Sequence, residues 1–154
     1  MKDWTFRSLS NGSKIDLIPY TEQKLAVRDD VSFYIGCDSQ NRGRSTHYGL
    51  VIVFHYGKNG GHVVYATKTI PRVKDKADRL LREAGFSIEL AQYLESHGIK
   101  KPDFIDLDFN PDPKYQSNMI LRSALGWVEA MGYKARCKPD AVSASYVADK
   151  ICHG

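Results

Sequence analysis

Long hydrophobic runs are absent from this sequence of 154 residues, and so is the basic and then apolar opening of a signal peptide. A membrane-spanning helix needs about 20 consecutive apolar residues, and a signal peptide needs a short apolar stretch after a positive start. These absences exclude the usual patterns of membrane and secreted proteins. We therefore expect no membrane partner and a location in the cytoplasm.

Cysteine is scarce. The three cysteines, Cys37, Cys137 and Cys152, form no CxxC pair and have no zinc-like spacing with the five histidines. Such spacing is what a disulfide framework or a structural zinc site requires. We expect the cysteines to be small buried hydrophobic residues.

Repeats, low-complexity tracts and long linkers are also missing, which predicts a single domain over residues 1–154. Residues 1–30 form a lead-in and residues 31–152 the core of this prediction. The composition, 42% hydrophobic and 26% charged, is typical of globular proteins. The net charge of +4 is compatible with a polyanionic partner but does not establish one.

The order of strand and helix patterns predicts an α/β fold. In the lead-in, Asn11-Gly12 suggests a hairpin, and residues 21–28 suggest one or two helical turns. Residues rich in β-branched and aromatic side chains predict strands over 31–39, 46–57, 61–71, 103–109 and about 134–138. Helical periodicity predicts helices over 75–97, from about 120 to 131, and over 141–152. The result is a five-stranded mixed sheet, an antiparallel meander followed by alternating helices and strands, with helices on its faces.

Acidic residues recur at positions where this fold would bring them together. Asp38 ends the first core strand and shares a face with Gly36, which leaves room beside it. Glu83 lies at the border of the apolar face of the first long helix, whereas Glu89 should point to water. A solvated Glu83 beside Arg79 or Arg82 is the competing interpretation.

Two further acids share one face of the strand at 103–109, and neighbouring desolvated carboxylates are retained mainly where a cation compensates them. Asp108 is better placed than Asp106 to meet Asp38, because it is nearer the carboxyl end of the strand. Asp140 precedes the last predicted helix, where it is also a natural N-cap. Asp149 is the alternative on that helix, too far along it to join the same cluster.

Basic residues gather ahead of the first long helix. Lys68, Arg72, Lys74, Lys76, Arg79 and Arg82 fall within fifteen residues that contain two acids. This pattern is compatible with a phosphate-binding rim, to which we assign Arg72 and Lys74, or with a solvated helix start. Lys114 could contact a phosphate or cap the next helix. Trp127, in an apolar helix, is more often a core residue than a base-stacking one.

Four ordered motifs resemble the YkuK-type ribonuclease H-like family of bacteria and phages: GCDSQ, RLLREAGFSIELA, DFNPDPKYQSN and KPDAVSASYVADK. The resemblance covers residues 31–150 and implies the ribonuclease H fold. In the wider superfamily, acids at the corresponding positions bind two Mg²⁺ or Mn²⁺ ions. The matching residues here are Asp38, Glu83, Asp108 and Asp140. The chain lacks the histidine-bearing loop of classical ribonucleases H, and its final Asp-Ala motif looks more like that of Holliday-junction resolvases.

The resemblance therefore implies a metal-dependent nuclease that hydrolyses phosphodiester bonds of an RNA–DNA hybrid or of structured or branched DNA. One metal ion would activate a water and the other would stabilise the leaving oxygen. A catalytically inactive nucleic-acid-binding module is the first alternative. A phosphodiesterase acting on a nucleotide signal is the second.

Overall fold

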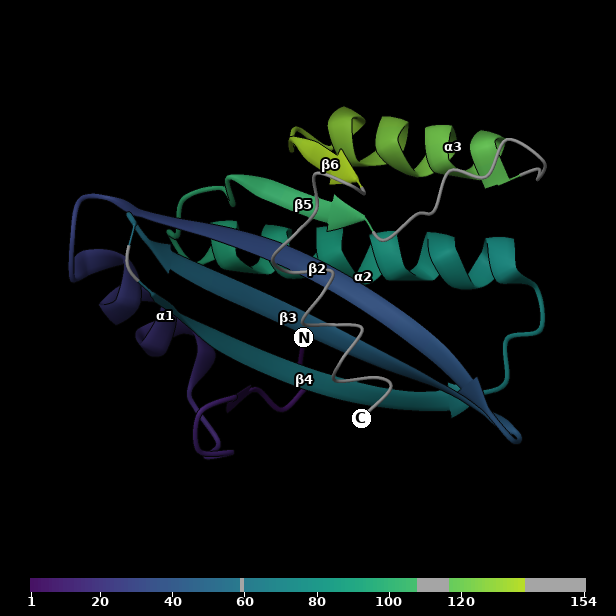
Figure 1. The fold of residues 1–154 in the computed structure, drawn as a ribbon, viewed down its shortest axis with the longest axis horizontal. Coiled ribbons are helices and arrows are strands. Elements are labelled where there is room, and N and C mark those ends of the chain that lie inside the picture. Colours follow the sequence, from purple (N-terminus) through teal and green to yellow (C-terminus); the bar gives the residue numbers. More distant parts are fainter. Residues whose placement is uncertain (59, 108–116, 138–154) are drawn as a thin grey trace.

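The computed structural model describes residues 1–58, 60–107 and 117–137, and Figure 1 shows their arrangement. In chain order the elements are β1 (Arg7–Ser8), α1 (Leu17–Ala26), β2 (Val31–Arg42), β3 (Ser45–Tyr56), β4 (Gly61–Pro71), α2 (Lys76–Ser96), β5 (Phe104–Leu107), α3 (Ser117–Ala130) and β6 (Ala135–Cys137). The predicted helix over 141–152 lies outside the described residues, as do Asp108, Lys114, Asp140, Asp149 and Cys152.

The described strands form one mixed sheet in the order β1-β4-β3-β2-β5-β6. The meander β2-β3-β4 is antiparallel, and β5 and β6 run parallel to β2. The predicted α/β class and mixed sheet are confirmed. The predicted number of five strands was wrong, because β1 pairs Arg7 and Ser8 with Tyr65 and Val64 of β4 to add a sixth. Two residues are too few to show strand alternation in a sequence.

The lead-in folds onto this sheet through a tight turn and a helix. The turn at Asn11-Gly12 is confirmed: Gly12 adopts a φ of 71°, and the amide of Ser8 donates to the carbonyl of Ser13. Helix α1 begins at Leu17, four residues before the predicted start, and its Tyr20 ring lies 6.5 Å from that of Phe54. The lead-in is therefore packed against the sheet.

Strand alternation divides β2 into two rows of side chains. Phe33, Ile35 and Cys37 belong to the row that faces the helices, and Phe33 stacks on Phe54 of β3 at 6.1 Å. The next residue, Asp38, pairs with Gly49 of β3. The prediction that Cys37 is buried is confirmed, whereas Cys137 is only half-buried.

Helix α2 packs across β2 on the same side of the sheet as α1 (Figure 1). Asp75 caps its start by accepting a hydrogen bond from the amide of Ala77. The helix ends just before Gly98, whose φ of 84° places it in the left-handed region as a helix stop requires. Its buried face contains the apolar residues Leu80, Ala84, Ile88, Ala91 and Leu94.

Helix α3 lies beside α2 and β6, and it buries Leu121, Ala124 and Val128. Met131, the residue after the helix, is exposed. Trp127 is also exposed, at 41%, so its interpretation as a core residue was wrong. Among the described helices, none is long and apolar enough to cross a membrane.

Candidate active site

Asp38 lies in β2 directly after the residues that pair with the described part of β5. Gly49 of β3 stands opposite it, and the last described parallel pair with β5 joins the preceding residue, Cys37, to Leu107. The side chain is only 7% exposed. An aspartate buried at this depth needs compensation, because transfer of a carboxylate out of water is costly.

Glu83 of α2 meets this strand end from the helix side. It is 5% exposed, and its Oε1 accepts a hydrogen bond of 3.0 Å from the hydroxyl of Ser39. Burial raises the pKa of Glu83 well above its usual value, and the negative charge of Asp38 raises it further. A side-chain hydrogen bond with Asp38 acts in the same direction, while Ser39 and the positive charge of Arg79 oppose it. We call Asp38 and Glu83 the acidic pair.

The expected position of Glu83 is confirmed, and so is that of Glu89. The Glu89 side chain is 52% exposed and lies 3.7 Å from the amino group of Met1. The interpretation of Glu83 as a solvated glutamate beside Arg79 or Arg82 was wrong, because Glu83 is buried. Arg82 pairs with Asp78 at 3.0 Å, and the charge of Arg79 acts on the buried carboxyl. Of the two glutamates, only Glu83 faces the sheet.

A small polar network fixes the start of α2 relative to β2. The Asn41 amide donates to the carbonyl of Val73 at 3.1 Å, and the Val73 amide donates to the hydroxyl of Thr46 at 2.9 Å. The Thr46 hydroxyl in turn donates to the Asn41 side chain. These bonds join the β2–β3 hairpin to the segment before α2. They therefore fix the position of α2 along β2 at which Glu83 lies next to Ser39.

Asp106 has a different partner from the acidic pair. It is fully buried, and both of its oxygens accept hydrogen bonds from Arg136 of β6, at 2.7 and 2.9 Å. The Arg136 guanidinium lies 4.6 Å from the ring centres of both Tyr34 and Phe104. Bidentate arginine–carboxylate pairs of this kind have a well-defined geometry. Asp106 therefore has a structural cation of its own.

The acidic pair fits a divalent cation. Mg²⁺ and Mn²⁺ prefer oxygen ligands, chiefly carboxylates, and Asp38 and Glu83 supply two carboxyl groups, with the Ser39 hydroxyl beside them. A bound cation would offset the repulsion that raises the pKa of Glu83. Within residues 1–58, 60–107 and 117–137, however, no group of three or more His, Cys, Asp or Glu side chains converges.

Ser39 was not among the residues predicted for the site, although it lies within the GCDSQ motif. Strand alternation alone points Ser39 toward the helices, on the same row as Cys37. A polar side chain in an otherwise apolar, helix-facing row is the signal that could have identified it. Its burial and its bond to Glu83 show why a hydroxyl stands there.

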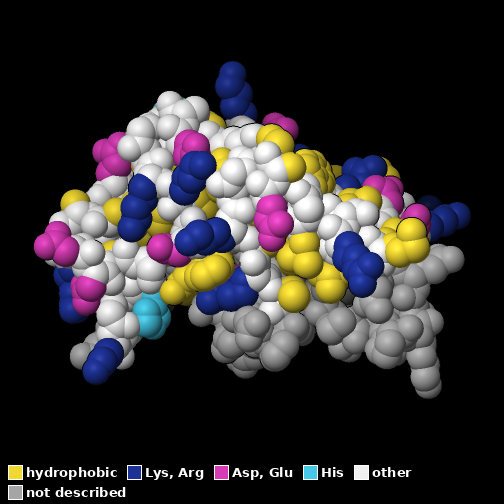
Figure 2. Space-filling model, turned by 90° about the horizontal axis from the view of Figure 1, so that it is seen from above, with side chains coloured by type: hydrophobic (Ala, Val, Ile, Leu, Met, Phe, Trp, Pro, Cys, Tyr) yellow, Lys and Arg dark blue, Asp and Glu magenta, His cyan; other side chains and the backbone are white. Residues whose placement is uncertain are grey.

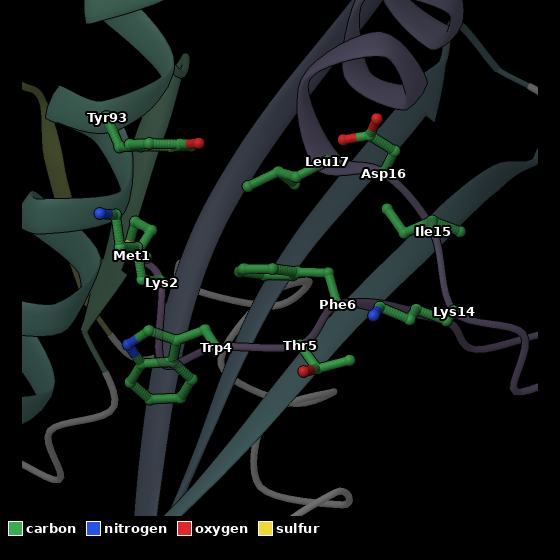
Figure 3. A pocket seen from close by; sticks show the side chains of 10 residues that line it. All are labelled: Met1, Lys2, Trp4, Thr5, Phe6, Lys14, Ile15, Asp16, Leu17 and Tyr93. Atoms are coloured by element: carbon green, nitrogen blue, oxygen red, sulfur yellow. The ribbon is translucent and has the colours of Figure 1, made fainter.

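Three hollows in the described part of the chain lie away from the acidic pair, and none of them is lined by a residue predicted to bind metal or phosphate. A cavity of about 270 Å³ lies between the lead-in, the start of α1 and Tyr93 of α2, with Lys2 and Lys14 among its lining residues (Figure 3). A shallower groove runs between α2 and α3, where the Trp127 ring lies over Gly85. Seen from the α3 side, hydrophobic side chains alternate with charged ones over the surface (Figure 2).

Comparison with known proteins gave one family and one distant structure. The family model described as "Ribonuclease H-like" matches residues 16–153. The crystal structure of RNase H1 from the halophilic archaeon Halobacterium salinarum NRC-1 is 17% identical, with a TM-score of 0.38 over 79% of this chain and 98% of that chain. No curated protein matches the chain.

Proposed function

Since the chain belongs to the ribonuclease H-like family, we propose that it is a divalent-metal-dependent nuclease that hydrolyses phosphodiester bonds of nucleic acid. One observation carries this proposal: Glu83 is buried against Asp38 and its pKa is raised. Two adjacent buried carboxyl groups are unfavourable in a purely structural role, so their retention favours a cation site. We further propose the YkuK-type branch of the family, found in bacteria and phages, on the four sequence motifs.

Asp108 and Asp140 complete the proposed site, as the sequence predicts. Together with the acidic pair they would supply four carboxylates, enough to hold two Mg²⁺ or Mn²⁺ ions near neutrality. Such ions, when bound, lower the pKa of a water and stabilise the leaving oxygen during phosphodiester hydrolysis. Within this site Asp38 and Glu83 hold the cations, and Ser39 keeps the Glu83 carboxyl turned toward β2.

The proposed substrate is an RNA–DNA hybrid or structured DNA, bound as a polyanion. Arg72 and Lys74 are both exposed just before α2, the helix that carries Glu83. Nucleic-acid backbones are bound chiefly by such cations. We propose Lys114 as a further phosphate contact. From the sequence we also propose one functional domain over residues 1–154. We propose that the protein works in the cytoplasm without a membrane partner.

A cleavage assay tests the proposal directly. The purified protein is incubated with labelled RNA–DNA hybrid, branched DNA, single-stranded RNA and single-stranded DNA, each with Mg²⁺, with Mn²⁺ and with EDTA. We expect metal-dependent cleavage of at least one substrate, lost to the background rate in Asp38→Asn and in Glu83→Gln. Glu89→Gln is the matched control on the same helix and should retain activity, because its side chain faces solvent.

The outcome of the panel also separates the alternatives. If no substrate is cleaved under any metal condition but nucleic acid still binds, the protein is a non-catalytic binding module. If Glu89→Gln abolishes cleavage and Glu83→Gln does not, Glu83 is the wrong choice for the metal-binding glutamate of α2, and Glu89 takes its place.

A further inference from the structure

The cavity of about 270 Å³ between the lead-in and α2 is a second place in the molecule where a ligand fits, and we call it the lead-in cavity. Its walls come from residues within 1–6 and 14–17 and from Tyr93 of α2 (Figure 3). Tyr93 follows Glu83 by ten residues on the same helix, which corresponds to about 15 Å at 1.5 Å per residue. The lead-in cavity is therefore separate from the acidic pair. Its volume, close to the roughly 300 Å³ of the smallest ligand pockets, suits one small molecule.

Contacts within the protein already hold the walls of the lead-in cavity in place. The Ile15 amide donates to the carbonyl of Phe6 at 3.0 Å, which joins the two stretches of the lead-in. The Trp4 ring packs edge-on against Phe86 of α2, with 5.2 Å between the ring centres, and so ties the first stretch to the helix. A cavity with fixed walls binds a small molecule at a lower entropic cost than one that must first be ordered.

The deepest part of the lead-in cavity is apolar. Trp4 and Phe6 line it while being only 7% and 4% exposed, and the half-buried Ile15 and Leu17 line it beside them. Aromatic and aliphatic side chains of this kind form the usual surface for the apolar ring of a ligand. We call these four residues the floor of the cavity.

The rim of the lead-in cavity is polar and carries a positive charge. Lys2, Lys14, Thr5 and Asp16 line it and are exposed, and the Tyr93 hydroxyl points from α2 toward Leu17 (Figure 3). Within the described part of the chain, the polar groups of these five lining side chains make no hydrogen bond or ion pair, and Asp16 does not cap α1. Two cations beside one acid favour an anionic ligand.

We propose that the lead-in cavity binds a nucleoside monophosphate. The base occupies the floor, the phosphate pairs with Lys2 and Lys14, and the sugar hydroxyls bond to the remaining rim groups, among which Asp16 accepts. A nucleoside monophosphate has a partner for each part of the lining, whereas an inorganic anion leaves the floor unused and an uncharged ring leaves both lysines without a counter-charge. This proposal does not depend on the nuclease function.

Isothermal titration calorimetry of the full chain in EDTA tests the proposal, with AMP as the probe and with adenosine and inorganic phosphate as its two halves. We expect one AMP to bind per chain, and each half to bind at least roughly tenfold more weakly. Lys2→Ala combined with Lys14→Ala, the cavity variant, should weaken AMP binding roughly tenfold, because it removes hydrogen bonds to a charged group. Adenosine binding should not change in this variant. Tyr93→Phe, which keeps the ring, should weaken AMP binding by roughly threefold.

Lys58→Ala combined with Lys134→Ala is the matched control, because it removes the same charge from exposed positions that do not line the cavity. Its affinity for AMP should equal that of the wild type. The ligand-free Tm of the cavity variant should also match that of the wild type, which excludes a folding defect. Trp4 emission, recorded in a Trp127→Phe background, should change as AMP saturates the protein, since Trp4 lines the cavity.

Four results would overturn the proposal: no saturable AMP binding with a Kd below about 1 mM, equal losses in the cavity and control variants, inorganic phosphate binding as tightly as AMP, or Trp4 emission that does not respond. Tighter binding of glucose 6-phosphate or of free phenylalanine would also overturn it, in favour of a sugar phosphate or an amino acid.

The Asp38→Asn variant separates this proposal from the nuclease function. It should bind AMP as tightly as the wild type does, and loss of AMP binding in it would place the nucleotide at the acidic pair and refute the cavity site. Absence of cleavage by the wild-type protein, with AMP binding as expected, refutes the nuclease function alone.

Discussion

Replacing Glu83 by glutamine should stabilise the metal-free protein at neutral and alkaline pH. The raised pKa of Glu83 means that folding favours its protonated form. The stability that this group contributes is therefore complete below the unfolded pKa and is lost as pH rises through the folded pKa. Glutamine keeps an oxygen that can accept a hydrogen bond from the Ser39 hydroxyl, but it carries no charge. The variant therefore does not lose this stability as the pH rises.

The size of the effect follows from linkage. For every pH unit by which the folded pKa of Glu83 exceeds its unfolded value, the wild-type protein loses about 1.4 kcal/mol relative to the variant at high pH. In a chain of this length that is roughly 3–6 °C in Tm. Below pH 4.5 the two proteins should unfold at nearly the same temperature, because the carboxyl is then protonated in both states.

Thermal unfolding followed by circular dichroism in EDTA, from about pH 3.5 to 8.5, measures this difference. Glu89→Gln is the control, and its Tm should follow that of the wild type across the range, since an exposed pair contributes little. Addition of Mn²⁺ should raise the Tm of the wild type more than that of Glu83→Gln. The reasoning is refuted if Glu83→Gln becomes less stable than the wild type as pH rises.

The structure also predicts the behaviour of two other positions. Asp106→Ala should destabilise the fold by about 1–3 kcal/mol in urea unfolding, because it leaves the partly exposed Arg136 guanidinium without this carboxylate. Asp106→Asn should keep metal-dependent cleavage, and loss of cleavage in this variant would restore Asp106 as a metal ligand. Gly85→Ala should displace the Trp127 ring, which lies 3.0 Å from the position of the added methyl group. We expect a red shift of Trp127 emission, recorded in a Trp4→Phe background, with a stability change within about 1 kcal/mol, since alanine favours the helix; unchanged emission would contradict it.

Much of the fold was predictable from the sequence because its core elements are long and strongly patterned. The three meander strands alternate clearly, and α2 carries an apolar face bounded by Asp75 and Gly98. The strand β1 was missed because two residues carry no period. Trp127 was misplaced because helical periodicity locates a face but does not tell how far a neighbouring helix covers it.

The acidic pair was predictable because both of its residues lie in long elements with a clear sequence pattern. The hydrogen bonds and ion pairs around it were not predictable. Strand parity and a helical wheel were enough to select Asp38 and Glu83 over Glu89. The bond from Ser39 and the pairing of Asp106 with Arg136 depend on contacts between residues 44 and 30 positions apart. Such contacts follow from the register of strands and helices, which one sequence does not specify.

The placement of β2 has a consequence for the order in which the molecule assembles. β2, β3, β4 and α2 are consecutive in the chain, and they contain both Asp38 and Glu83. The hairpins among the strands close short loops, and the Ser39–Glu83 contact spans 44 positions, whereas β5 pairs with residues of β2 that lie 70 positions earlier, as in Tyr34 with Phe104. Shorter loops form faster. We therefore expect Asp38 and Glu83 of the proposed metal site to come together while the ribosome is still synthesising the rest of the chain, before β5 pairs with β2.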